Sequence, residues 1–246
     1  PSTGCTSPLW GAVFALAHGL FGDTTDGVVV AVMLVSAALH VGLAIYSGLL
    51  VRRLSADALA GVIGGGLVAV ATPFAAASFS GRDVVLTGLL LLAGVGAATG
   101  GRWFGSGLCL ALAALSRPES ASVALVVGAF AAVDAKNPSN AAWRLARFAL
   151  PLALGAGLFI GYDLWASGAP LPATFYAKKS TVLTDLPRRF EVAFRDMLPA
   201  VPPLGLGLGW FALLGFVAGG SRAQPDGPGP RRRILLLPVI AGLAYL

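Results

Sequence analysis

Charged residues are scarce in this sequence, since only 11% of its 246 residues are Asp, Glu, Lys or Arg. Soluble domains carry about 25%. Apolar residues reach 57% of the chain, and the mean hydropathy is +0.82. This composition excludes an ordinary soluble domain, and it predicts an integral membrane protein.

Cysteine and histidine are also rare. Cys5 and Cys109 are too few for a disulfide framework, and Cys109 lies within an apolar segment. His18 and His40 are far apart, with no second ligand at metal-binding spacing, so packing roles are expected for both. No strand precedes the glycines of IGGGL at 63–67, which excludes a phosphate-binding loop and favours close helix packing.

Long apolar runs separated by short polar segments fill the chain. At about 20 residues per crossing they predict about eight membrane segments. The predicted fold is all-α, a polytopic transmembrane helix bundle with short broken helices and an outer loop containing an amphipathic helix. Residues 1–246 are expected to form a single transmembrane domain. The chain starts without Met and stops inside an apolar run, so it is expected to be a fragment truncated at both ends.

The predicted spans follow the apolar runs. They cover residues 28–51, 58–79, 84–98, 148–165 and 201–218, with a last one beginning at Ile234. Two further runs, 104–115 and 121–133, are too short to cross alone at about 1.5 Å per residue. Because Pro118 would break a continuous helix, a re-entrant segment or a pair of short helices is expected between them.

The distribution of Lys and Arg predicts which loops lie on the cytoplasmic side of the membrane and which lie outside. Arg52 and Arg53 directly follow the first span, and Lys and Arg flanking a span tend to stay in the cytoplasm. Alternation then makes residues 134–147 an inner loop. It places most of the Lys and Arg inside and most of the Asp and Glu outside, so the outer face is expected to hold the functional site.

The outer loop between the predicted spans 148–165 and 201–218 is an exception to the rule that Lys and Arg stay in the cytoplasm. It contains Lys178, Lys179, Arg188, Arg189 and Arg195. Lys and Arg suit phosphate groups, which predicts phosphate or pyrophosphate binding by the loop. The alternative is a solvated amphipathic helix over residues 186–198, which accounts for the arginines. The two lysines precede that helix, and they are grouped with the neighbouring Thr174 and Tyr176 as substrate-binding candidates.

Two further pairs of ionisable residues interrupt apolar runs. Arg117 and Glu119 flank Pro118, where they either bind an anionic head group and orient an acceptor or form a structural ion pair at a broken helix. Asp83 follows Arg82 at the start of a span. It is a catalytic candidate, and the alternative is that it only complements the dipole at a helix N-terminus.

Four short stretches carry a resemblance. They are TSPLW at 6–10, SGRD at 80–83, LSRPES at 115–120 and GAPLPATFYAKKS at 168–180. In this order they resemble the polytopic bacterial glycosyltransferases of the GT-C class, in particular the group similar to the terminal arabinofuranosyltransferase of the mycobacterial cell wall. The resemblance implies an enzyme of the bacterial plasma membrane with its active face outward.

Enzymes of this class transfer a sugar, with inversion, from a polyprenyl-phosphate donor to an acceptor glycan or lipid. For this chain the resemblance implies that Lys178, with Lys179 and Arg117, binds the carrier phosphate. Asp83 or Glu119 would orient the sugar or the acceptor. Membrane lipids are further expected partners, nucleic acid is not, and no cofactor is assigned.

The sequence departs from the family in two places. The family's catalytic Asp usually precedes the region that matches TSPLW, so the main base is expected upstream of Pro1 and the fragment is expected to lack it. The family also commonly has Met-Glu where this chain has Arg82 and Asp83.

Two rival functions remain open. A transporter or flippase for a lipid-linked sugar would bind similar phosphate groups, and a transporter would show a repeated pair of interrupted spans. A non-catalytic membrane subunit would use the basic loop to bind an anionic lipid or a partner.

Overall fold

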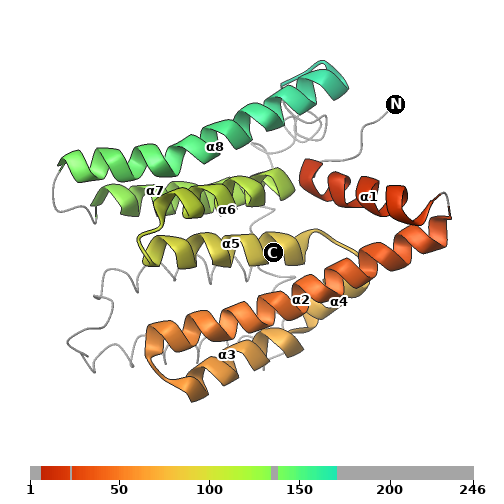
Figure 1. Ribbon diagram of the computed structural model, residues 1–246, viewed down its shortest axis with the longest axis horizontal. Coiled ribbons are helices and arrows are strands. Elements are labelled where there is room, and N and C mark those ends of the chain that lie inside the picture. Colours follow the sequence, from red (N-terminus) through yellow and green to blue (C-terminus); the bar gives the residue numbers. More distant parts are fainter. Residues whose placement is uncertain (1–6, 23, 134–137, 171–246) are drawn as a thin grey trace, which may run out of the picture. The chain divides into compact units, whose positions relative to one another are not determined.

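The computed structural model describes residues 7–22, 24–133 and 138–170, and all regular structure in this part is helical. The all-α class is therefore confirmed for these residues. Figure 1 shows the α-helices, which are α1 (Pro8–Phe21), α2 (Thr25–Ser55), α3 (Ala58–Val70), α4 (Thr72–Phe79), α5 (Val84–Thr99), α6 (Trp103–Ser116), α7 (Ala121–Val133) and α8 (Pro138–Ser167). A 3-10 turn, η1 (Pro118–Ser120), lies between α6 and α7.

The described residues fall into two compact units, which divide within α8. One unit contains Ser7–Phe159, and the other begins at Ile160. The helix packing below belongs to the first unit. The predicted spans at 201–218 and from Ile234, and the predicted amphipathic helix at 186–198, lie outside the described residues.

Helices α5, α6 and α7 confirm the sequence-based boundaries to within one residue. Helices α6 and α7 form an antiparallel hairpin on α8. A Cβ on Gly107 of α6 would meet the Phe148 carbonyl oxygen, and a Cβ on Gly128 of α7 would lie 3.2 Å from Phe148 Cε1. The two glycines lie at similar sequence distances from Pro118 and contact the same residue, so the two helices fold back on each other. Of the two expectations for this region, the pair of short helices is the one present.

Two sequence-based expectations about loops are wrong. The segment 134–147 was expected to be a loop, but α8 begins at Pro138 and continues through it. Proline at the start of a helix loses no hydrogen bond, which makes this boundary favourable. Helix α1 was not predicted, although Pro8 begins it in the same way.

Two helices, α2 and α8, are long and apolar enough to cross a membrane. Only 28% of the α2 window and 17% of the α8 window are buried in the structure, whereas the core helix of a soluble protein is mostly buried. The exposed side chains include Leu34 and Val41 on α2 and Leu154 and Leu158 on α8. Continuous exposed apolar surface of this kind marks a face that meets lipid or another protein.

Helices α2 and α3 approach each other closely at glycines, as the IGGGL stretch predicted. A Cβ on Gly48 would lie 2.8 Å from the Gly61 carbonyl oxygen, and a Cβ on Gly61 would lie 2.9 Å from that of Gly48. One turn further along α3, a Cβ on Gly65 would lie 2.9 Å from the Ala44 carbonyl oxygen. Only glycine permits this backbone approach, because any side chain would push the helices apart.

The expected span at 58–79 is wrong as a single helix, because it breaks at Ala71. Ala71 has extended backbone (φ −64°, ψ 108°) between α3 and α4. Pro73 cannot donate the hydrogen bond that would carry α3 onward. His40 of α2 bridges the break, since its Nε2 donates to the Val68 carbonyl oxygen (3.1 Å) and its Nδ1 lies 2.8 Å from Ser78 Oγ. The expected packing role of His40 is thus a hydrogen-bonded one.

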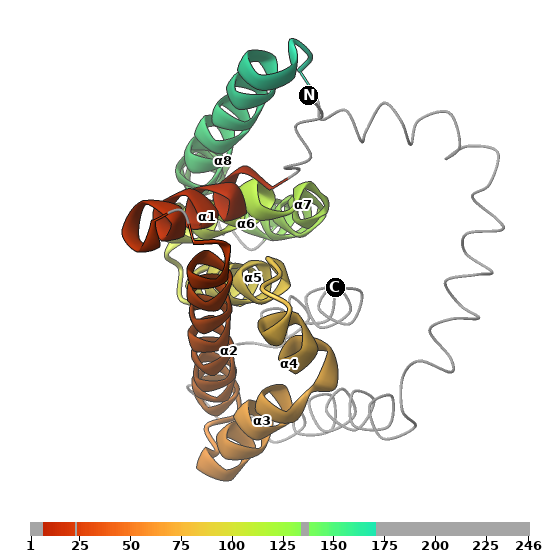
Figure 2. The same cartoon turned by 90° about the vertical axis from the view of Figure 1, so that its right-hand side faces the viewer.

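Helix α5 is the most enclosed helix of this unit, and it packs against both α2 and α6. A Cβ on Gly94 would lie 2.7 Å from Leu110 Cγ of α6, and one on Gly96 would meet the Tyr46 hydroxyl of α2. Figure 2 shows α5 between α2 and α6, with α1 beside α2 and α6. The antiparallel course of α5 and α6 brings the start of α5 to the end of α6.

Substituting Gly65 and its neighbour Gly66 on α3 tests the contact between α2 and α3. Gly65→Ala should lower the free energy of unfolding by about 1–3 kcal/mol, because its methyl group meets backbone atoms. Gly66→Ala is the matched control, since a Cβ there has nothing within 4 Å. It should be neutral or stabilise the helix by up to about 1 kcal/mol. Unfolding in detergent, followed by circular dichroism, measures both; equal effects would contradict the close approach.

Candidate functional site

The junction between α6 and α7 places Arg117 at the end of a helix. Arg117 is the C-cap of α6 and has extended backbone (φ −143°, ψ 111°), the conformation that a following proline favours. Its amide donates to the Ala113 carbonyl oxygen (2.7 Å), and its own carbonyl oxygen accepts from Ser120 Oγ (2.7 Å). The break predicted at Pro118 is confirmed, and it holds the half-buried Arg117 in a defined backbone position.

Asp83 occupies the N-cap position of α5, the position required by one of the two roles that the sequence left open for it. Its side chain makes no cap hydrogen bond to the α5 amides, and its backbone is already helical (φ −68°, ψ −11°). Its carbonyl oxygen accepts from the Thr87 amide (2.9 Å) and from Thr87 Oγ1 (3.0 Å). The adjacent Arg82 is exposed, whereas Asp83 is half-buried.

A buried hydrogen bond ties these two positions together. The Thr87 and Ser116 hydroxyls are hydrogen-bonded to each other, with Oγ1 and Oγ 2.9 Å apart. Thr87 lies one helical turn after Asp83, and Ser116 directly precedes Arg117. The structure therefore places Asp83 and Arg117 at the same end of the α5 and α6 pair. Sequence reasoning did not single out Thr87, and it included Ser116 only as part of the LSRPES stretch, although hydroxyl residues within apolar helices were a usable signal.

The start of α1 joins the same end of the bundle. Trp10 Nε1 donates to the Gly81 carbonyl oxygen at 3.0 Å. Gly81 has a left-handed backbone (φ 63°), which favours glycine at this turn. Trp10 is buried in an apolar cluster with Ala17, Ala31 and Val32. The stretches at 80–83 and 115–120 and the described part of the first stretch, residues 7–10, thus meet at one place, which we call the motif end.

Several predicted site residues are not brought to the motif end by the described structure. Glu119 lies in η1, and the placement of its side chain is outside what the structure describes. Thr174, Tyr176, Lys178 and Lys179 lie outside the described residues. The stretch at 168–180 is described only as far as Pro170, in the unit that begins at Ile160.

Arginines gather at the other end of α5 and α6. Arg52 and Arg53 lie in the last turn of α2, Arg102 is the N-cap of α6, and Arg144 and Arg147 lie in the part of α8 that packs near the start of α6. A Cβ on Gly100, which caps α5, would lie 3.3 Å from Arg53 Nη2. Arg144 Cζ lies 5.7 Å from the ring centroid of Trp103, the first residue of α6. These residues were all predicted to share one side of the membrane, and they lie together at what we call the basic end.

Within the described ranges, no three His, Cys, Asp or Glu side chains form a group that could hold a metal ion. The chemical groups described at the motif end include the Asp83 carboxylate, the Arg82 and Arg117 guanidiniums and several hydroxyls. Together they suit orientation of a polar ligand and binding of an anion.

Comparison with protein-family models, with curated proteins and with solved structures found no match.

A double-mutant cycle tests the bond that joins α5 to α6. Thr87→Val and Ser116→Ala should each destabilise the protein, with a coupling energy of about 0.5–1.5 kcal/mol between them. Ser106→Ala on α6 is the control. Ser106 is fully buried, and its hydroxyl has no hydrogen-bond partner among the described residues, so its loss should be neutral or stabilising. A coupling energy near zero in detergent unfolding would contradict the assignment.

Proposed function

We propose that this protein is a polytopic membrane glycosyltransferase. It transfers a sugar from a polyprenyl-phosphate donor to an acceptor glycan or lipid on the outer side of a bacterial plasma membrane. The observation that supports this most is the meeting of three of the four resembling stretches at the motif end. Stretches that serve one reaction must lie close together, and these three are separated by more than a hundred residues at their extremes.

The exposed apolar faces support the membrane part of the proposal. Helices α2 and α8 each present large apolar side chains outward along a length sufficient for a crossing. The separation of the basic end from the motif end follows the expectation that Arg-rich ends stay in the cytoplasm. The motif end then faces outward, the side on which the transferase would act.

In this reaction the basic and the acidic side chains have different roles. The bond between the anomeric carbon and the phosphate oxygen breaks, and a new bond forms to the acceptor oxygen, whose proton passes to a base. Lys178, Lys179 and Arg117 stabilise the phosphate that leaves on the carrier lipid. Thr174 and Tyr176 contact the substrate beside them. Asp83 and Glu119 orient the sugar or the acceptor hydroxyl.

The rival functions make different structural demands. A transporter built from repeats needs matching interrupted spans in its two halves. Within the described residues, the junction at 117–120 turns a hairpin, and the interruption within one span lies instead at Ala71. A repeated pair is thus lacking in this part of the chain. A flippase is distinguished by lipid movement without sugar transfer.

Substitutions in the outer loop test the proposed phosphate contact. Lys178→Ala should lower the rate of sugar transfer about 10- to 100-fold, since a charge-assisted hydrogen bond contributes about 1.5–3 kcal/mol. Arg189→Ala is the control, because Arg189 belongs to the expected water-facing helix. Transfer is measured in membranes that contain the protein, with polyprenyl-phosphate arabinofuranose as the first donor tested.

Unchanged transfer and donor affinity in Lys178→Ala would remove the loop from the mechanism. Movement of the lipid-linked sugar across vesicles without any transfer to acceptor would replace the transferase with a flippase.

A further inference from the structure

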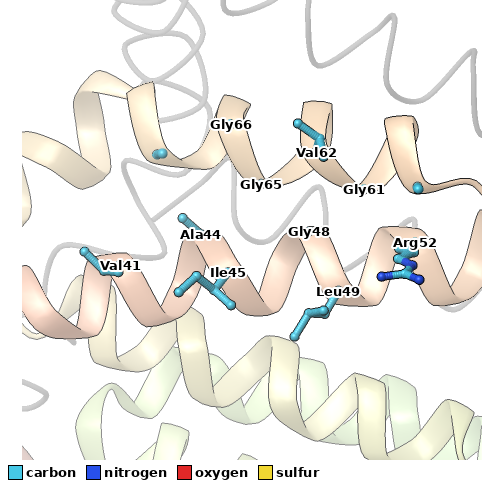
Figure 3. Close-up of a pocket in the computed structure, with 12 residues that line it drawn as sticks. Val41, Ala44, Ile45, Gly48, Leu49, Arg52, Gly61, Val62, Gly65 and Gly66 are labelled. Carbon is cyan, nitrogen blue, oxygen red and sulfur yellow. The ribbon is translucent and has the colours of Figure 1, made fainter.

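An open apolar groove runs between α2 and α3, with a volume of about 510 Å³ (Figure 3). Val41, Ile45 and Leu49 form its α2 side, and Val62 and Gly66 lie on its α3 side. All five of these residues are exposed. The groove is open because the glycines at the contact between α2 and α3, Gly48 and Gly65 among them, have no side chains to fill the space between the two helices.

One cation lies at the end of this groove. Arg52 is the last α2 residue that lines it, and its side chain is exposed. Among the described residues, Arg52 makes no ion pair or hydrogen bond through its guanidinium. Arg53 and the rest of the basic end lie on the same side. The groove therefore combines an apolar length with a positive terminus, which is complementary to a lipid that carries an anionic head group.

The length of the groove supports the same occupant. From Val41 to Arg52, α2 rises about 16 Å at 1.5 Å per residue. One leaflet of a bilayer contributes about 15 Å of hydrocarbon, half of the full core. With Arg52 at the head-group level, Val41 reaches the bilayer midplane. A single acyl chain thus fits the groove from end to end.

We propose that this groove binds one anionic phospholipid, with an acyl chain between α2 and α3 and its phosphate on Arg52. The inference rests on the proposal that α2 crosses a membrane, and it does not depend on sugar transfer. The site lies at the basic end, so it is separate from the motif end and from the loop assigned to the polyprenyl-phosphate donor.

Native mass spectrometry of the full chain, purified in detergent and titrated with phosphatidylglycerol or phosphatidylcholine, tests the site. The protein should bind phosphatidylglycerol more tightly. Arg52→Gln should weaken phosphatidylglycerol binding about fivefold and remove the preference, the effect expected for one cation at a membrane surface. Arg82→Gln, an exposed arginine at the motif end, should bind both lipids as the unchanged protein does.

A second variant fills the groove without disturbing the fold. A Cβ on Gly66 has nothing within 4 Å, so Gly66→Leu places its side chain in the groove and should weaken binding of both lipids at least fivefold. Gly157→Leu on α8 is the control, because a Cβ there is equally unhindered. Unfolding in detergent should be alike for the two variants.

Three results would overturn the proposal. Equal binding of the two lipids by the unchanged protein would remove the role of charge. Unaltered binding in both Gly66→Leu and Arg52→Gln would place the lipid elsewhere. A dimer that dissociates in Gly66→Leu, with no change in bound lipid, would assign the groove to a second copy of the chain.

Discussion

The close packing of α5 is the constraint on which the rest of the Ser7–Phe159 unit depends. Gly94 and Gly96 on this helix leave room for the side chains of Leu110 from α6 and Tyr46 from α2, so both neighbouring helices pack closely on it. The antiparallel course of α5 and α6 then determines which residues share an end. Asp83 and Arg117 share one end, and the basic end lies at the other, because the chain reverses at Gly100 and Gly101.

Much of the helix pattern could be predicted from sequence, because composition and proline act locally. The limits of α5, the break at Pro118 and the packing at IGGGL all follow from single residue types. The break at Ala71 was missed although Pro73 was a local signal for it, whereas the hydrogen bonds of His40 to Val68 and Ser78 from a separate helix could not be predicted. The start of α8 was missed because polar residues there suggested a loop, whereas Arg144 is accommodated by stacking on Trp103.

The candidate site was predictable only in part, because its residues are brought together by contacts between helices that are distant in sequence. The sequence singled out Asp83 and Arg117 as charges within apolar surroundings, but their common location depends on Thr87 and Ser116, which are separated by 29 residues. Trp10 was recognised only as part of a resembling stretch, and its bond to Gly81 gives that stretch a structural role. A stretch that supports the fold and one that binds substrate look alike in a single sequence.

The account depends most on the claim that the motif end and the basic outer loop share one side of the membrane. Single cysteines at Ser80, Ser180 and Ser55, each placed in a background without Cys5 and Cys109, test it with an impermeant thiol reagent in intact cells. The account predicts labelling at Ser80→Cys and Ser180→Cys, with Ser55→Cys at the basic end protected until the membrane is opened. Labelling of Ser80→Cys and Ser180→Cys from opposite sides would contradict it.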